Sequence, residues 1–207
     1  MALGTIIRSF ASPAPIGPGI VFTGRTIGIS SYGEALLYQV YLRAGVVIRS
    51  INTPQTNPWG LAFDGKYLWM AAVGANQLWA LDPRNGAGVR TLSFTPGSPA
   101  ALTWDGHYLW VGSDTDNRIY QVDPRDGTVG ESSLSPGGSP TGLAFAGKLL
   151  WSSDNVDDKI YGLDPRNGTI VRSFNSPGAQ AAGLAFDGKV LYHADYNNAL
   201  IYQLSLN

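Results

Sequence analysis

The 207-residue sequence contains no cysteine, which excludes disulfide bonds, thiol catalysis and thiolate metal sites. Charged residues make up only 14% of the chain and the formal net charge is −1, so bulk electrostatics favours neither a nucleic acid nor a membrane surface as a partner. No apolar run approaches the roughly 20 residues of a membrane span. The common motifs of serine hydrolases, phosphate-binding loops and zinc proteases are absent. These absences weigh against an enzyme and leave the cellular compartment open.

Glycine and proline, in contrast, are abundant, with 26 and 13 residues, as many tight turns require. The chain also repeats with a period of 41 residues. Four segments align at this spacing: GLAFDGKYLW at 60–69, ALTWDGHYLW at 101–110, GLAFAGKLLW at 142–151 and GLAFDGKVLY at 183–192. A fifth, degenerate copy, GIVFTG, begins at Gly19. A fixed period of this length indicates a repeat architecture.

Each copy predicts four short strands. The first ends in a tight turn such as Asp64-Gly65, where glycine tolerates a positive φ. The second and third strands, such as 67–69 and 119–122, carry the β-branched and aromatic residues typical of strands. An Asp-Pro-Arg turn, as at 123–127, leads into the fourth. Four antiparallel strands in about 40 residues is the spacing of a propeller blade.

The last copy stops at Asn207 without its fourth strand, and the missing segment lies at the other end of the chain. GTIIRSF at 4–10 matches GTIVRSF at 168–174 almost letter for letter. The sequence therefore predicts an all-β fold: a closed five-bladed β-propeller in which the N-terminal strand completes the last blade. We expect a single domain over 1–207, with blade 1 at about 19–51, blade 2 at 60–92, blade 3 at 101–133, blade 4 at 142–174 and blade 5 at 183–207 plus 4–10.

Large aromatic residues recur at two positions of the repeat, and we expect both sets to pack between neighbouring blades. The first-strand set is Phe22, Phe63, Trp104, Phe145 and Phe186, and the second-strand set is Trp69, Trp110, Trp151 and Tyr192. Arginines recur on the fourth strand, for example Arg49 and Arg90, where charge would protect an exposed sheet edge.

With these residues in view, the chain resembles the NHL-type and related propeller repeats. Their blades read Gly-Leu/Val-Ala-hydrophobic-Asp-Gly, followed by Ala/Ser-Asp, Asn-Arg-Ile and Asp-Pro. SDTDNRI at 113–119 and DYNN at 195–198 are the closest matches here. The resemblance covers the whole chain and implies the fold, because related blades serve enzymes, receptors and scaffolds alike.

A second resemblance is to the five-bladed glutaminyl cyclases, whose first blade carries a catalytic Tyr-Glu-Ser-Thr stretch on its second strand. The corresponding positions here lie near Gly28-Ile29-Ser30-Ser31, where no carboxylate is present. The catalytic glutamate is thus absent, and this resemblance also implies the fold without the activity.

Antiparallel blades divide their connections between two faces. The turns within strand pairs one–two and three–four are stereotyped and form what we call the turn face. The connections between the second and third strands, and between successive blades, vary from copy to copy and form the loop face. Turn formation alone does not require this variation, so we expect any functional site on the loop face.

Aspartates gather in the loop-face connections of blades three to five, and histidine lies beside one of them. One interpretation is a cation site, with Ca²⁺ as the candidate ion and ligands from several blades, for which the candidates are Asp114, Asp154, Asp195 and His193. The alternative is that these are solvated turn residues, since no spacing matches a compact calcium loop. His193 and Asp195 are two residues apart on a strand and therefore share one side of it.

Three aromatic residues break the repeat on the same face. Trp59 stands where the other blades have Pro18, Ala100, Thr141 and Ala182, and Tyr32 and Tyr196 occupy equivalent positions after the second strand. Blades five, one and two are neighbours in a closed ring, so the three could form one patch near the axis. Such a patch suits stacking on a sugar or flat ligand, or anchoring a peptide. The alternative is a hydrophobic lid over the channel.

These features favour a non-enzymatic binding propeller that presents its loop face to a small molecule, glycan or peptide, and we expect a monomer. A metal-dependent propeller hydrolase, lactonase or lyase that uses the aspartate-rich sector is the alternative. A purely structural repeat module, as a fragment or an engineered protein, is a third possibility.

Overall fold

The computed structural model describes residues 1–14, 19–42 and 45–207, which form twenty β-strands. No part of this described chain is a helix with the length and apolar character of a membrane span. The strands in chain order are β1 (Ile6–Ala11), β2 (Ile20–Phe22), β3 (Thr26–Ser31), β4 (Leu36–Tyr41), β5 (Val46–Asn52), β6 (Pro58–Phe63), β7 (Leu68–Ala72), β8 (Gln77–Leu81), β9 (Gly88–Ser93), β10 (Pro99–Trp104), β11 (Leu109–Ser113), β12 (Arg118–Val122), β13 (Val129–Leu134), β14 (Pro140–Ala146), β15 (Leu149–Asp154), β16 (Lys159–Leu163), β17 (Ile170–Asn175), β18 (Ala181–Phe186), β19 (Leu191–Asp195) and β20 (Leu200–Leu204).

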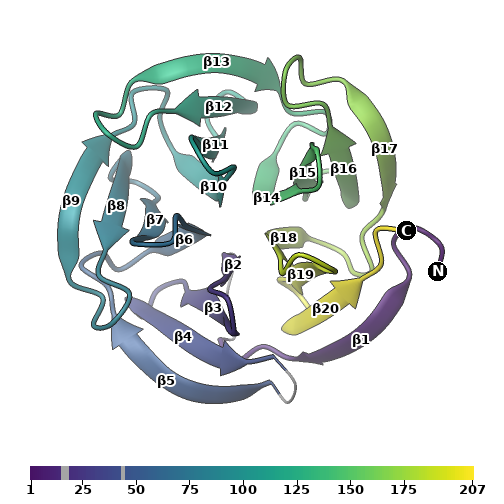
Figure 1. The fold of residues 1–207 in the computed structure, drawn as a ribbon, viewed down its shortest axis with the longest axis horizontal. Helices are drawn as coiled ribbons and strands as arrows, with labels where there is room; N and C mark the ends of the chain where they lie inside the picture. Colours follow the sequence, from purple (N-terminus) through teal and green to yellow (C-terminus); the bar gives the residue numbers. More distant parts are fainter. Residues whose placement is uncertain (15–18, 43–44) are drawn as a thin grey trace.

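The strands form five antiparallel four-stranded sheets around one axis (Figure 1). Four sheets follow chain order: β2-β3-β4-β5, β6-β7-β8-β9, β10-β11-β12-β13 and β14-β15-β16-β17. The first strand of each lies nearest the axis and the fourth lies at the rim. The predicted five-bladed propeller is thereby confirmed.

The fifth sheet closes the ring with strands from both ends of the chain, in the order β18-β19-β20-β1. β1 pairs antiparallel with β20, from Ile6 opposite Leu204 to Ala11 opposite Leu200. The termini lie close together at the rim as a result (Figure 1). This pairing confirms that the N-terminal strand completes the last blade.

The core lies between neighbouring blades, as the second-strand aromatic residues predict. One cluster packs Trp69 of blade 2 with Leu102 and Leu109 of blade 3, and the Trp69 side chain is fully buried. Trp110, Trp151 and Tyr192 are also buried in such clusters. The rim strands are mostly exposed because only one of their edges is covered.

The aspartate that recurs in the first turn explains how the indoles of Trp69 and Trp110 are buried without losing their hydrogen bonds. Asp64 accepts hydrogen bonds from the backbone N–H groups of Lys66 and Tyr67 and, at 2.7 Å, from Trp69 Nε1. Asp105 repeats the arrangement with Trp110 at 2.8 Å. A single side chain thus stabilises the hairpin and satisfies the buried ring.

The recurring rim arginines join blades as well as charging an edge. Arg49 of β5 donates to the carbonyl oxygens of Pro83 (2.8 Å) and Arg84 (2.6 Å) in the turn of the next blade. Arg90 makes the same two bonds to Pro124 and Arg125. The edge-protection hypothesis therefore describes only part of what these side chains do.

Candidate functional site

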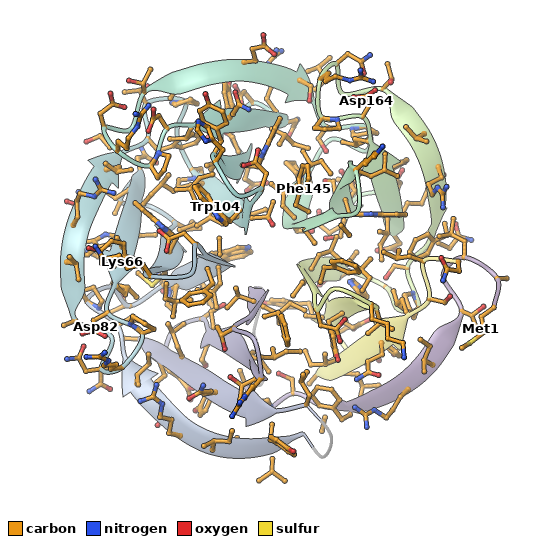
Figure 2. The ribbon with its side chains drawn as sticks, viewed as in Figure 1. Met1, Lys66, Asp82, Trp104, Phe145 and Asp164 are labelled. Atoms are coloured by element: carbon orange, nitrogen blue, oxygen red, sulfur yellow. The ribbon has the colours of Figure 1, made fainter. Side chains whose placement is uncertain are left out.

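The channel along the axis holds a cavity at each end. The cavity at the turn-face end has a volume of about 100 Å³ and is lined by the inner strands β2, β6, β10, β14 and β18. Its rings are the first-strand aromatic set, which is half-buried, and Trp104 and Phe145 lie close to the axis (Figure 2). The expectation that this set packs only between blades is therefore incomplete, because the rings also line the axis.

The cavity at the loop-face end is larger, about 310 Å³, and we call it the loop-face cavity. The described residues that line it are Trp59, Thr141, Asn155, Gln180, Ala181, Ala182 and Tyr196. They come from blade 2, blade 4 and blade 5, so the cavity crosses the axis. Two of the three aromatic residues singled out in the sequence, Trp59 and Tyr196, thus share one cavity.

The third aromatic residue, Tyr32, is not among the lining residues, but it contacts Trp59, which is. Tyr32 packs edge-on against Trp59 with a ring-centroid distance of 5.3 Å. The Trp59 backbone is fixed from blade 1, since buried Ser30 donates a 2.9 Å hydrogen bond to the Trp59 carbonyl oxygen. A β-carbon at Gly19 would lie 1.9 Å from that same oxygen, so glycine permits the close approach of the two blades. The Trp59 side chain is therefore held in place by its neighbours.

The Trp59 indole also carries a polar group that has no partner among the described residues. Its Nε1 is buried and forms no hydrogen bond with any described residue. Buried indole N–H groups normally have an acceptor, because leaving one unpaired costs about 1–3 kcal/mol. A buried donor left unpaired in a native structure calls for an explanation.

The far side of the cavity is polar but carries no charge. Gln180 has a φ of +64° and is held there by the Asp158 carboxylate, which accepts its backbone N–H at 2.7 Å. The Gln180 carbonyl in turn accepts the backbone N–H of Tyr196 at 3.3 Å. Asn155 is exposed nearby on the next loop-face connection. Among the described lining residues there is no carboxylate, imidazole or amine, so the cavity suits an uncharged ligand.

The predicted metal ligands of blades 3 and 4 meet at one serine. Asp154 is buried and accepts the backbone N–H groups of Ser139 (2.7 Å) and Val156 (3.0 Å). Asp114 accepts the Ser139 hydroxyl at 3.2 Å. Burial raises the pKa of the Asp154 carboxyl despite these bonds. Asp154 thus shapes the loop before blade 4.

The other two candidates lie one blade further on. His193 is fully buried, and its Nε2 lies 2.8 Å from the hydroxyl of Ser176. Burial lowers the pKa of His193 to about 3, so the ring is neutral at pH 7. Asp195 accepts the backbone N–H of Asn198 at 2.8 Å, while its Oδ2 is buried without a partner among the described residues. Within the described chain, no three His, Asp or Glu side chains are grouped so as to hold a metal ion.

Two further aspartates of the same sector have a structural partner. Asp116 accepts the hydroxyl of Tyr120, and Asp157 accepts the hydroxyl of Tyr161, in both cases four residues along the chain. These bonds tie the loop-face connection to the third strand of the blade. The concentration of acid in this sector is therefore partly explained by loop formation.

The cavity also includes residues that were not singled out in the sequence. Thr141 stands at the Trp59 position of its blade, and Asn155 stands at the position of Tyr32 and Tyr196, so comparing equivalent positions could have identified both. Gln180 carries no such signal, because its place depends on a left-handed loop conformation.

Comparison with known proteins agrees with the fold. The chain matches no protein-family model and no curated protein. The crystal structure of glutaminyl cyclase from Myxococcus xanthus is similar, with a TM-score of 0.85 and 17% identity over 99% of this chain and 96% of that chain. The Cps50 (Swd1) β-propeller domain from Myceliophteria thermophila has a TM-score of 0.61 and 12% identity over 99% and 100%. The computationally designed protein Ika8 has a TM-score of 0.55 and 16% identity over 89% and 57%.

The class that these findings define is a five-bladed β-propeller. At such low identity the likeness establishes the fold alone. The expected resemblance to the glutaminyl cyclase fold is thus confirmed at the level of architecture, whereas a relationship to NHL-type repeats is not shown.

Proposed function

We propose that this propeller is a binding module whose loop-face cavity holds one small, uncharged, hydroxyl-rich ligand of the saccharide class. The observation that carries the proposal is the cavity of about 310 Å³, which Trp59 and Tyr196 line together with Asn155 and Gln180. Its size lies at the lower end of small-molecule pockets, about 300–1,000 Å³. A folded protein partner would need a much larger surface.

The lining supports this ligand class. A sugar ring has an apolar C–H face, which packs well on an aromatic side chain, and an edge of hydroxyl groups. Asn155 and Gln180 each offer donors and an acceptor to such an edge. The unpaired Trp59 N–H would find an acceptor in a hydroxyl oxygen. The described lining has no carboxylate, imidazole or amine, and the Tyr196 hydroxyl is its one ionisable group, which favours binding over catalysis.

The test is titration of the full chain with neutral mono- and disaccharides, followed by calorimetry and ligand-observed NMR. We expect one of them to bind, and Trp59→Ala to weaken that binding about tenfold or more. Trp59→Phe should weaken it less, because it keeps the ring and removes only the N–H. The matched control is Trp104→Ala, which removes a half-buried indole from the opposite end of the channel and should leave affinity unchanged.

Two results would contradict the proposal. The first is the absence of saturable binding by every neutral saccharide. The second is an equal loss of affinity in Trp59→Ala and Trp104→Ala. Such a result would mean that affinity depends on the intact fold and not on the loop-face cavity in particular.

A further inference from the structure

One blade lacks the aromatic ring that the other four bury on their second strand. Trp69, Trp110, Trp151 and Tyr192 occupy this position in blades 2 to 5, whereas β3 of blade 1 has Gly28. The residue opposite the ring on the inner strand is alanine in blades 2, 4 and 5, as in the pair of Ala62 with Trp69, and Thr103 in blade 3. In blade 1 the opposite residue is Val21, paired with Gly28. Val21 occupies part of the space of the missing ring, since its Cγ1 would lie 3.0 Å from a β-carbon at Gly28.

Val21 does not fill the space completely. A cavity of about 60 Å³ remains at the boundary between blades 1 and 2, and we call it the seam cavity. Its apolar walls include Leu37, Ile51 and Leu68, with Gly28 at its base. The volume is several times the roughly 10–15 Å³ that one water needs, and less than half of the roughly 150 Å³ of an engineered cavity that binds benzene. A ring bound here would be partly enclosed and partly exposed.

The polar groups that surround the ring in blade 2 have counterparts around the seam cavity. The Arg90 guanidinium lies 5.3 Å from the Trp69 ring centroid. Arg49 lines the seam cavity and is fixed by the same pair of carbonyl bonds to the next turn as Arg90. Its cation is therefore positioned over a space that in blade 2 contains an indole.

The acceptor for the ring edge has a counterpart too. Asp64 accepts the Trp69 N–H at 2.7 Å, and the equivalent residue in blade 1 is Thr23, whose side chain lines the seam cavity. The Thr23 hydroxyl lies 2.8 Å from the Thr26 hydroxyl and can still accept a hydrogen bond through a second lone pair. Blade 1 thus retains the cation, apolar walls and an acceptor, while Thr23 and Val21 stand in place of the aspartate and alanine of blade 2 and the ring is missing.

We propose that the seam cavity binds a planar aromatic small molecule of the indole class, which enters where the other blades place their own ring. The ring would pack against Leu37 and Leu68 beneath the Arg49 guanidinium, with its N–H directed to Thr23 Oγ1. This site is separate from the loop-face cavity, and the described residues lining the two are different.

The experiment titrates the full chain with indole and 1-methylindole by saturation-transfer NMR and thermal shift. We expect indole to bind in the millimolar range, consistent with a partly enclosed ring. The double substitution Val21→Ala/Gly28→Trp copies the Ala62–Trp69 pair and fills the cavity with the chain's own ring. It should weaken indole binding about tenfold or more and raise the melting temperature. Val21→Ala is needed because Val21 Cγ1 would lie 3.0 Å from a β-carbon at position 28.

Thr23→Val provides a second, nearly isosteric test that does not depend on folding of the double variant. It should weaken indole and leave 1-methylindole, which has no N–H, unchanged. Trp59→Ala is the control for binding in the loop-face cavity and should leave indole affinity as it is. Three results would each overturn the proposal. They are no binding of indole to the wild-type chain, unchanged affinity in Val21→Ala/Gly28→Trp, and an affinity that falls only in Trp59→Ala.

Discussion

The two ends of the channel are built from the same strands, yet they differ in how closely they follow the repeat. At the turn-face end, all five blades contribute an aromatic residue at one position, from Phe22 to Phe186. At the loop-face end, Trp59 faces Thr141 and Ala182, which are its own counterparts in blades 4 and 5. Positions that every blade keeps serve the packing that every blade needs. The Trp59 position differs between blades, and a large aromatic residue there is not required by the repeat.

The seam between blades 1 and 2 extends this comparison into the interior. Four blades fill the second-strand position with a ring, and one does not. We therefore expect substitutions at repeated and at unrepeated positions to differ in their effect on stability, which the following predictions examine.

The largest expected contrast is between two tryptophans. Trp110 is buried in the repeat register between blades 3 and 4, so Trp110→Ala should cost about 3–5 kcal/mol of unfolding free energy through the cavity it leaves. Trp59 is half-buried, and its main described ring contact is Tyr32, so Trp59→Ala should cost about 1 kcal/mol. Urea unfolding followed by circular dichroism measures both. Equal losses would show that Trp59 belongs to the core, and the contrast between the two ends would fail.

A second contrast concerns a polar residue at a core position. His193 occupies a place held by Ile29, Met70 and Val111 in blades 1 to 3 and by the buried Ser152 in blade 4, and burial lowers its pKa to about 3. The unfolded imidazole has a pKa of about 6.5, so below that pH the unfolded state binds the extra proton. Stability should therefore fall as pH decreases from about 6.5 towards 3, by up to about 1.4 kcal/mol per pH unit.

The variant His193→Gln isolates this effect, because it keeps a polar side chain beside Ser176 and cannot ionise. Unfolding measured between pH 7 and pH 5 should show a flatter pH dependence for the variant than for the wild type. Asp123 and Asp164 have their pKa lowered to about 2 by Arg125 and Arg166, so their contribution is lost mainly below about pH 4, outside this window. Parallel pH curves for the two proteins would show that His193 is not the group responsible.

The fold was predictable because the period survives almost every substitution. Gly4–Phe10 could be assigned to blade 5 from its match to 168–174 alone, since a strand pairs through its backbone and needs only the right side-chain alternation. Trp59, Tyr32 and Tyr196 could be singled out because each departs from the repeat at a position near the axis. Proximity between adjacent blades then followed from ring closure.

The placement of the aspartates and of Gln180 could not be predicted, because it depends on loop conformations that the repeat spacing does not specify. Asp154 and Asp195 are equivalent residues in adjacent blades, and each turns into its own loop, against Gly137 and Gly178 respectively. Equivalent positions are separated by the width of a blade, so the aspartate-rich pattern does not by itself bring ligands together. Gln180 reaches the loop-face cavity through a left-handed backbone, which no residue in the sequence signals.

The smallest predicted effect concerns blade 4, where the turn aspartate of the repeat can be restored by substitution. In blade 4 the turn aspartate is replaced by Ala146, and Trp151 Nε1 is buried without a partner among the described residues. Ala146→Asp should supply the acceptor that Asp105 gives Trp110, and stabilise the protein by about 1 kcal/mol at pH 7.

The reciprocal variant, Asp105→Ala, should cost about 1–3 kcal/mol because it orphans the Trp110 N–H together with two backbone N–H groups. Thermal and urea unfolding of Ala146→Asp and Asp105→Ala measure the two changes in stability. If Asp105→Ala destabilises while Ala146→Asp leaves stability unchanged at pH 7, the blade 4 hairpin has diverged in shape as well as in sequence. The turn face would then be less uniform than its residues suggest.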